Sequence, residues 1–476
     1  MSKDTVVDVA VLADLPPEWP EDLLPSIKAS LVAGAKKRPQ KVVVLDDDPT
    51  GTQTVRDVPV LTSWSVEELK DELLAEGTAF FILTNSRSLP EDQAGSLAEE
   101  IAGNIFRASG ECGVKVTLIS RSDSTLRGHF PAEVDCMATV MNQQGRPYLI
   151  FPFFLEGGRY TFNDVHYVRE GDTLVPAAQT PFARDAAFGF NFSNLRDWVA
   201  EKTGGRLKPD SVYSISIEDI RLGGPEKVAA KLLAVQPGSA CVVNSVSYRD
   251  VEVVVTALLM AEQAGQEFLY RTAASFVRTR LGQPCEQKLL GSREIVTDTS
   301  AGGLFVIGSY VEKTSRQVEA LFTRTDIDRV MVNVAQLLDA TTREQEIETA
   351  RQRCEELLRT GRDVALYTSR KLIVGDSAGE SLDIGRIVSA GLIQIVSSIS
   401  VQPRYLVAKG GITSSDVATR ALKVRRAMVV GQPLPGVPAW RLGDESRYPG
   451  MVYIVFPGNV GSDDALAELK LNLENR

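Results

Sequence analysis

The sequence predicts an α/β protein of two domains, each with a mainly parallel sheet flanked by helices, and an active site in the cleft between the domains. Two observations predict this class. Short β-branched runs lead repeatedly through a polar loop into an amphipathic helix, which is the pattern of parallel α/β layers. The chain of 476 residues also exceeds what one hydrophobic core usually supports.

The first predicted domain covers residues 41–296, and residues 1–40 are an extension rich in proline and acidic residues, outside the main sheet. A helix is expected after the second strand, because Ala94, Leu97, Ile101 and Ile105 share one face. Another helix follows Val251. The expected strands are Val42–Leu45, Phe80–Leu83, Val114–Ile119, Tyr148–Phe151, Val212–Ile217 and Cys241–Val246.

The second predicted domain covers residues 297–476. The glycine-containing stretch 298–303 is the candidate linker. A charged helix presents Ile347, Ala350, Cys354 and Leu357 on one side and stops at Gly361. The expected strands are Leu304–Ile307, Val330–Val334, Val364–Tyr367 and Tyr405–Ala408.

Composition excludes several classes of function. With 52 basic and 62 acidic side chains, the net charge of -10 disfavours binding to a phosphate backbone, so no nucleic-acid partner is expected. No apolar run approaches the ~20 residues of a membrane span, and a cytoplasmic protein is expected. The five cysteines form no C-x-x-C pair, and two histidines are too few for a His-rich metal centre. A carboxylate is therefore the favoured general base, and one histidine paired with Asp or Ser is the alternative.

The first candidate loop follows the strand 42–45 and begins with Asp46, Asp47 and Asp48. Asp48-Pro49-Thr50-Gly51 has the residue choices of a type I turn, which is the structural interpretation. That interpretation leaves unexplained why three consecutive carboxylates follow an apolar strand. They repel one another unless a cation, an arginine or a proton relieves them, and we therefore favour a functional site.

Two further loops follow neighbouring apolar runs, where open α/β sheets bind their ligands. Thr84-Asn85-Ser86-Arg87 is a weak signal alone. The stretch 120–128 is richer, with two arginines, four hydroxyl side chains and one carboxylate. A guanidinium matches a carboxylate, and hydroxyl groups can bond to a polyol, so the composition suits a small hydroxy-acid. The alternative is a serine-rich turn that caps a helix.

A fourth loop contains Glu156-Gly157-Gly158-Arg159. Its glycines would either let the backbone approach a ligand or simply turn the chain, and the sequence leaves both readings open.

The second domain lacks both the P-loop pattern and any G-x-G. Gly308-Ser309 ends one expected strand. Lys409–Ser415 ends another and opens a helix with hydroxyl residues, so glycines and free backbone N–H groups could bind an anion there. Phe456–Gly461 is a third loop of this kind. Each of them alone is more simply a cap or a turn.

These segments together resemble the four-carbon acid sugar kinase family, from about Lys41 to the end of the chain. In the first domain the similar motifs are Asp47–Gly51, Ser86-Arg87, Asp123–Gly128 and Gly157–Arg159. In the second they are Gly308-Ser309, Gly410–Thr413, Gly436–Pro438 and Pro457–Gly461.

The resemblance implies a kinase that uses ATP and Mg²⁺ to phosphorylate a hydroxyl of a small sugar acid such as a tetronate or oxo-tetronate. In that case residues 41–296 form the sugar-acid-binding domain and residues 297–476 the nucleotide-binding domain. It leaves the protein ligands of the metal and a possible homo-oligomer open. The implied substrate-binding residues are Asp48, Arg87, Arg121, Ser122, Asp123, Ser124 and Arg127. The implied ATP-binding residues are Ser309, Gly410, Gly411, Thr413, Gly458, Asn459, Val460 and Gly461.

In the expected mechanism, positioning and charge neutralisation carry most of an in-line phosphoryl transfer. Asp48 or Asp123 accepts the hydroxyl proton, and Arg87 and Arg121 clamp the substrate carboxylate. One rival is a nucleotide-responsive sugar-acid binding protein without phosphotransfer. Another is an aldolase or isomerase, which would need a Schiff-base lysine or a metal cage that the acid-site loops do not favour.

Overall fold

The computed structural model describes residues 5–284, 288–309, 311–370, 378–458 and 460–474. The chain forms two units. Unit 1 comprises Met1–Val55 and Ser63–Gln287, and unit 2 comprises Arg56–Thr62 and Lys288–Arg476. The short segment 56–62 thus belongs to unit 2 although its neighbours in the sequence belong to unit 1.

A parallel sheet forms the centre of unit 1, and every neighbouring pair of its strands is parallel. The strands carry continuous buried runs such as Val42–Asp46 and Ala79–Leu83, as expected for strands covered on both faces. Their order across the sheet is β10 (Tyr213–Ile215), β11 (Ala240–Val243), β6 (Tyr148–Phe151), β12 (Leu269–Thr272), β5 (Lys115–Arg121), β2 (Gln40–Asp46) and β4 (Ala79–Leu83).

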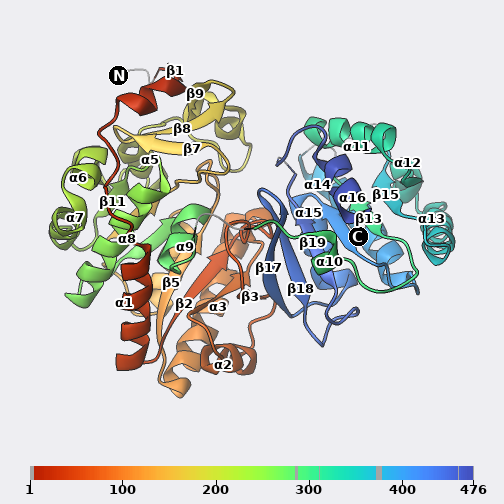
Figure 1. The fold of residues 1–476 in the computed structure, drawn as a ribbon, viewed down its shortest axis with the longest axis horizontal. Coiled ribbons are helices and arrows are strands. Elements are labelled where there is room, and N and C mark those ends of the chain that lie inside the picture. The colour runs from red at the N-terminus through yellow and green to blue at the C-terminus, as the bar shows by residue number, and fades with distance from the viewer. Residues whose placement is uncertain (1–4, 285–287, 310, 371–377, 459, 475–476) are drawn as a thin grey trace. The chain divides into compact units, whose positions relative to one another are not determined.

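The helices of unit 1 pack as neighbours in two groups. The first is α2 (Val66–Leu74), α3 (Glu91–Cys112) and α4 (Ala132–Val140). The second is α1 (Leu24–Lys37), α6 (Ile217–Arg221), α7 (Gly224–Leu233), α8 (Tyr248–Gln263) and α9 (Ala274–Arg280), with α1 alongside α8 (Figure 1). A shorter helix, α5 (Leu195–Lys202), contacts β11. The predicted face of α3 is confirmed, because Ala94, Ile101 and Ile105 are buried and Leu97 is half-buried.

A second, antiparallel sheet of unit 1 was not expected from the sequence. It has the order β1 (Val7–Asp8), β9 (Thr173–Pro176), β8 (Val165–Glu170) and β7 (Arg159–Phe162). Through β1 and α1, the N-terminal extension forms part of unit 1 while lying outside the parallel sheet. Arg221 Nη1 donates to Pro16 O at 2.7 Å and Arg249 Nη1 donates to Glu21 O at 2.6 Å, which holds the segment between β1 and α1.

The sheet of unit 2 combines parallel and antiparallel pairs. Its parallel strands follow the order β19 (Val452–Phe456), β16 (Leu406–Lys409), β13 (Leu304–Ile307), β15 (Val364–Thr368) and β14 (Asp328–Val332). An antiparallel extension adds β18 (Val437–Leu442), β17 (Arg426–Leu434) and β3 (Val58–Leu61) beside β19. The segment 56–62 therefore contributes a strand to unit 2.

Helices and a large apolar core complete unit 2. Phe305, Tyr405, Val407 and Ile454 are fully buried in that core. The helices are α10 (Ser292–Ile295), α11 (Glu312–Arg324), α12 (Val334–Leu338), α13 (Arg343–Arg359), α14 (Ala378–Ser398), α15 (Gly411–Asp416) and α16 (Ala465–Glu474).

Two predicted strands end earlier than expected because a cap residue starts a helix. Ser216 accepts a hydrogen bond from the Asp219 backbone and forms a capping box, so Ile217 begins α6. Asn333 accepts from Ala335 N at 3.0 Å, so Val334 begins α12. In both cases the apolar residue after the cap, Ile217 or Val334, is buried in the first turn of the helix, and it was therefore counted with the strand.

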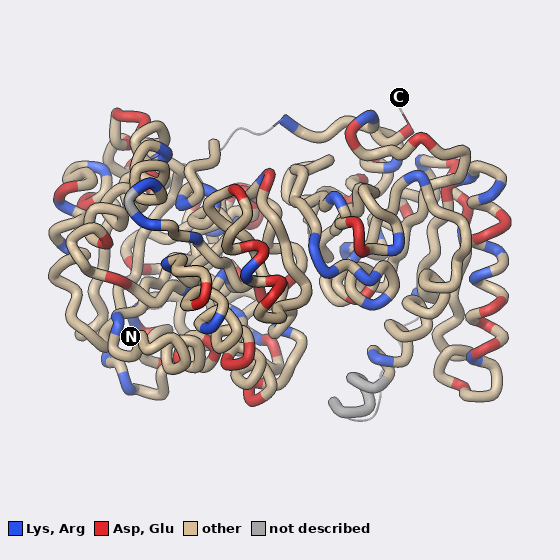
Figure 2. Tube along the Cα trace, turned by 90° about the horizontal axis from the view of Figure 1, so that it is seen from below, with Lys and Arg blue, Asp and Glu red and all other residues tan. Residues whose placement is uncertain are grey.

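Basic and acidic residues are interspersed along both units (Figure 2). Among the residues that the structure describes, no helix combines the length and the apolar character needed to cross a membrane.

Candidate functional site: an arginine and aspartate network in unit 1

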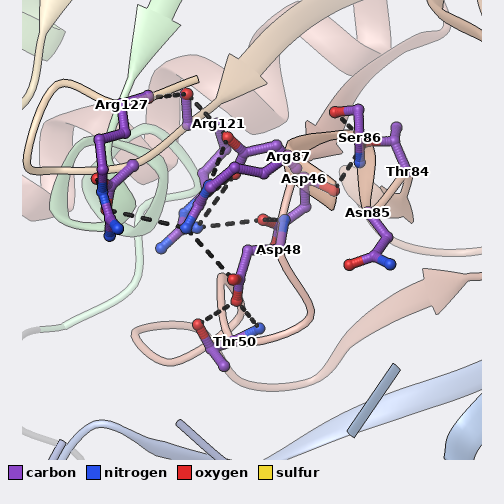
Figure 3. A network of polar contacts seen from close by, with 12 residues as sticks. Asp46, Asp48, Thr50, Thr84, Asn85, Ser86, Arg87, Arg121 and Arg127 are labelled. Atoms are coloured by element: carbon purple, nitrogen blue, oxygen red, sulfur yellow. Dashed lines mark hydrogen bonds and ion pairs between the residues drawn. The ribbon is translucent and has the colours of Figure 1, made fainter. Parts of the chain in front are cut away.

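The three predicted acid-binding loops of unit 1 meet at one edge of its sheet. They follow β4, β2 and β5, which are neighbouring parallel strands, so their carboxyl ends lie side by side. Figure 3 shows the side chains of Asp48, Arg87 and Arg121 converging there.

Asp46 and Arg121 form the deepest pair of this network. Arg121 Nη1 donates to Asp46 Oδ1 at 3.2 Å, and the side chains are 5% and 2% exposed. Burial raises the pKa of Asp46 to about 7, with Arg121 opposing the shift and the neighbouring aspartates adding to it. Asp46 therefore takes up a proton near neutral pH, which relieves part of the repulsion in the triplet.

Asp47 is bound by groups from both flanking strands. Arg87 Nε donates to Asp47 Oδ2 at 3.2 Å and Arg87 Nη2 donates to Asp47 Oδ1, which is the bidentate geometry of a guanidinium and a carboxylate. Ser122 Oγ donates to Asp47 Oδ2 at 3.0 Å. Gly128 is required beside this group, because a Cβ there would lie 2.7 Å from Ser122 Oγ.

Asp48 both forms the expected turn and takes part in the charge network. Gly51 N donates to Asp48 O at 3.0 Å, which closes the predicted turn, and Thr50 N donates to Asp48 Oδ1 at 2.8 Å. Arg87 Nη1 lies 3.3 Å from Asp48 Oδ2. Burial alone would raise the pKa of Asp48, but Arg87 and the hydrogen bonds from Thr50 outweigh it and hold that pKa below its usual range.

The loop after β5 binds its own aspartate. Arg127 Nε donates to Asp123 Oδ2 at 2.8 Å, and Thr125 Oγ1 donates to the same oxygen. Burial opposes ionisation, yet Arg87 and Arg127 hold the pKa of Asp123 below its usual range. Leu126 has a φ of 70° while fully buried, a conformation that a leucine rarely adopts and that marks local strain.

The backbone of this loop is fixed by a histidine of the small sheet. His166 Nε2 lies 2.7 Å from Ser124 O, so this nitrogen carries the proton and donates. His166 Nδ1 then accepts from Thr161 Oγ1 at 2.8 Å. Burial lowers the pKa of His166 to about 4, so the ring is neutral at physiological pH. Ser124 is thus held through its carbonyl oxygen, and its own side chain is buried.

Of the two interpretations of the fourth loop, the structure supports the one in which the glycines turn the chain. Gly158 N donates to Leu155 O at 2.9 Å, and Gly158 has a φ of 70°. A Cβ at Gly157 would overlap the ring of Phe154. Glu156 is anchored, since Tyr248 Oη donates to its carboxylate at 2.7 Å.

Three charged residues near the network were not among the predicted site residues. Arg159 begins β7, and Arg271 lies on β12, a strand that the sequence pattern did not predict. Glu133 of α4 accepts a hydrogen bond from Ser86, and burial raises the pKa of Glu133 to about 7. Arg159 belonged to a motif of the family resemblance, whereas Arg271 and Glu133 carry no local signal.

In unit 2 the predicted glycine-rich loops also converge, because β19, β16 and β13 are parallel neighbours. Ser309 Oγ lies 3.1 Å from Thr314 Oγ1, which donates to Gly458 O at 3.4 Å. A Cβ at Gly410 would lie 3.0 Å from Ser309 Cβ, and a Cβ at Gly308 would overlap Thr413 Oγ1. The glycines are therefore needed for close approach of the loops.

The remaining predicted residues of this region are placed as follows. Gly411 is the first residue of α15, and Gly461 has a φ of 85°. Gln317 Nε2 donates to Val460 O at 3.0 Å. Asn459 lies outside the described residues.

Lys409 supports the last of these loops and was not predicted as a site residue. It is fully buried at the end of β16, and its Nζ donates to Gly458 O at 3.0 Å and to Pro457 O. Burial, and to a lesser extent Lys313, lowers the pKa of Lys409 to about 7.

Within the described part of the chain, no group of three or more His, Cys, Asp or Glu side chains is placed to hold a metal ion. The carboxylates of Asp46, Asp47 and Asp48 each have an arginine partner instead. We therefore assign no protein ligands to a metal.

Comparisons with known proteins agree with the division into two units. Residues 42–280 match the family model of a sugar-binding N-terminal domain, and residues 304–466 match that of a nucleotide-binding C-terminal domain. The D-threonate kinase of Salmonella typhimurium strain LT2 is 26% identical over 414 residues, which is 83% of this chain and 88% of the relative.

Two solved structures share the fold. A Salmonella typhimurium LT2 protein, provisionally described as a tRNA synthase, superposes with a TM-score of 0.65 at 15% identity, over 91% of this chain and 99% of that protein. A Haemophilus influenzae protein superposes with a TM-score of 0.60 at 18% identity, over 90% of this chain and 100% of that protein. At these identities the likeness concerns the fold alone. The two matched domains decide the family: this chain belongs to the four-carbon acid sugar kinase family.

Proposed function

We propose that this protein is an ATP-dependent kinase that phosphorylates a hydroxyl of a small sugar acid, most simply a four-carbon tetronate. The observation that carries the proposal is the network of arginines, aspartates and hydroxyl side chains in unit 1, within residues that match a sugar-binding domain. Guanidinium groups suit the carboxylate of an acid, and carboxylates and hydroxyls suit its hydroxyl groups. The D-threonate kinase relative supports the same substrate class.

Asp123 is our preferred general base of the two candidates. Its Oδ2 accepts from Arg127 and Thr125, while Oδ1 has no hydrogen bond among the described residues and lies 4.0 Å from Arg87 Nη1. Both oxygens of Asp48 are engaged, by Thr50 and by Arg87. Asp123 is ionised at neutral pH, and a weak base suffices when the transition state is loose and little proton transfer is needed.

The glycine-rich loops of unit 2 are the proposed nucleotide site. Ser309, Gly410, Thr413 and Gly458 lie close together, and the matched family model is a nucleotide-binding domain. Mg²⁺ is expected to arrive with the phosphates of ATP, because it usually keeps several water ligands and binds few protein groups. No step of the proposal depends on a metal ligand from the protein. A cytoplasmic location and a homo-oligomer remain predictions.

The proposal is tested by incubating the full chain with ATP, Mg²⁺ and a panel of tetronates that includes D-threonate, and by measuring ADP release. We expect ADP release that depends on one or more of the acids and a phosphorylated product detectable by mass spectrometry. Binding of an acid and of ATP without turnover would favour the rival sugar-acid sensor. Absence of both binding and turnover across the panel would reject the kinase assignment.

A further inference from the structure

More arginine side chains surround Asp123 than its single carboxylate can neutralise. Besides its own hydrogen-bonded partner Arg127, Asp123 interacts electrostatically with three further guanidinium groups, those of Arg87, Arg159 and Arg271. One carboxylate cannot pair with four arginines. An arginine of this group without an acceptor in the protein is available to bind a ligand.

Three of these arginines have hydrogen-bond acceptors within the protein. Arg87 donates to Asp47 and Asp48. Arg127 donates to Asp123 and lies 3.5 Å from Asp185 Oδ2. Arg271, which is 1% exposed, donates through Nη2 to Arg127 O at 3.0 Å, while its Nε and Nη1 are buried without a partner among the described residues. Each of them therefore supports the protein's own structure.

Arg159 differs from the other three. Among the described residues, its guanidinium has no hydrogen-bond acceptor and no carboxylate within ion-pair distance, and its Nε is buried without a partner. A buried guanidinium nitrogen without an acceptor is costly, and native structures rarely keep one unless a ligand or water satisfies it.

Arg159 and Arg127 share one aromatic ring. The Cζ atoms of Arg127 and Arg159 lie 5.1 and 5.6 Å from the centre of the Phe182 ring, in the short 3-10 helix Pro181–Arg184. Burial lowers the pKa of Arg159, and the like charge of Arg127 lowers it further, against the attraction of Asp123. Two cations held on one ring, of which only one is paired, are stabilised by an anion between or beside them.

We infer that Arg159, together with Arg127, binds the carboxylate of the sugar acid, and that Phe182 orients both guanidinium groups for it. This inference rests on the proposed function. It differs from the expectation that Arg87 and Arg121 clamp that carboxylate, since those side chains bind Asp46, Asp47 and Asp48. A carboxylate held here places the hydroxyl groups of the same small molecule near Asp123, and it makes the site select acids over neutral polyols.

The rival explanation is that Arg159 only packs on Phe182. A cation–π contact of this kind contributes about 0.5–2 kcal/mol. In that case, replacing Arg159 would lower the thermal stability of unit 1 and leave the affinity for an acid unchanged. Ligand affinity, measured beside stability, therefore separates the two explanations.

The experiment compares Arg159→Met and Arg159→Lys with wild type and with the control Arg169→Met. Arg169 lies on the adjacent strand β8, is exposed, and donates to Gly171 O at 2.9 Å, so its removal takes away the same charge without touching the network. Isothermal titration calorimetry without nucleotide measures the affinity for D-threonate and the other tetronates, and for the neutral polyol threitol. Thermal unfolding of each variant reports its fold.

We expect Arg159→Met to weaken binding of the acid about 10- to 100-fold, because the substitution removes a charge-assisted hydrogen-bonded pair. Arg159→Lys should bind the acid more tightly than Arg159→Met and more weakly than wild type, because lysine keeps the positive charge but cannot make the bidentate hydrogen bonds of a guanidinium. Arg169→Met binds like wild type. The preference for acid over threitol falls by the same factor as the acid affinity in Arg159→Met and by a smaller factor in Arg159→Lys.

Acid binding in Arg159→Met as tight as in wild type would overturn this inference while leaving the kinase proposal intact. Failure of the wild-type protein to bind any tetronate would overturn the proposed function and this inference with it. Should Arg159→Met fail to fold, the comparison of Arg159→Lys with wild type decides the matter in the same way.

Discussion

Arg87 donates to both carboxylate oxygens of Asp47, through Nε at 3.2 Å to Oδ2 and through Nη2 to Oδ1. The same guanidinium reaches Asp48 Oδ2 at 3.3 Å through Nη1. Arg87 therefore joins the loop after β4 to the loop after β2. Its position explains how consecutive aspartates can end a buried strand.

Removing Arg87 should destabilise unit 1. Arg87→Met leaves Asp47, whose side chain is 6% exposed, without its main partner, and we expect a loss of about 3 kcal/mol in the free energy of unfolding. Urea unfolding followed by circular dichroism measures this loss. Arg107→Met, an exposed arginine of α3, is the control and should change stability by less than about 0.5 kcal/mol. Equal stability of the two variants would show that the Asp47 pair contributes nothing.

Asn substitutions should separate the two candidate bases. Asp123→Asn is expected to lower kcat about 10²-fold, the low end for loss of a general base, because a loose transition state needs little proton transfer; the KM for ATP changes little. Asp48→Asn should affect kcat less, since Asp48 binds Thr50 and Arg87. ADP release at saturating acid and ATP measures both. A larger loss of kcat in Asp48→Asn would reverse the assignment.

The buried His166 should make stability depend on pH in a defined window. Its pKa is about 4 in the folded protein and about 6.5 in an unfolded chain, so below pH 6.5 the unfolded state binds the additional proton. Stability is therefore lost as pH falls from 6.5 towards 4, and this group alone removes about 2 kcal/mol between pH 7.5 and pH 5.

The variant His166→Gln tests this, because glutamine can donate to Ser124 O and accept from Thr161 Oγ1 without titrating. The difference in unfolding free energy between wild type and variant should shift by that amount over the same pH range. Parallel pH profiles for the two proteins would contradict the buried neutral histidine.

Gly410→Ala should weaken ATP binding. Gly410 has a φ of 112°, and a Cβ there would lie 3.0 Å from Ser309 Cβ, so the loops after β13 and β16 would have to separate. The matched control is Gly450→Ala, where φ is 73° and nothing lies within 4 Å of an added Cβ. Gly450→Ala carries the strain of a positive φ, about 1 kcal/mol, and Gly410→Ala carries more, because a ψ of 145° places Gly410 in a region that essentially only glycine occupies. Only Gly410→Ala should lower ATP affinity in a calorimetric titration.

The sequence by itself determined the class of fold and most of the parallel strands. Continuous buried runs such as Val42–Asp46 and Ala79–Leu83 can be recognised locally, since strands covered on both faces contain almost only apolar residues. The loops after these strands carry their polar residues in the sequence itself, so Asp48, Arg87 and Asp123 were predicted.

The antiparallel strands gave no such signal. The strands β7, β8 and β9 are short and partly polar, and β3 pairs with β17 across more than half of the chain. Pairing over that distance depends on tertiary packing, and a local pattern does not encode it.

Only the tertiary structure decided how the charges are shared among the site residues. Composition identified arginines and aspartates near one sheet edge, but it could not reveal that Arg87 and Arg121 bind the Asp46–Asp48 triplet while Arg159 has no carboxylate partner among the described residues. The physical reason is that the pairing of charges depends on distances of a few ångströms between residues far apart in the sequence. Those distances are set by the order of β4, β2 and β5 in the sheet and by the packing of Phe182 against two arginines.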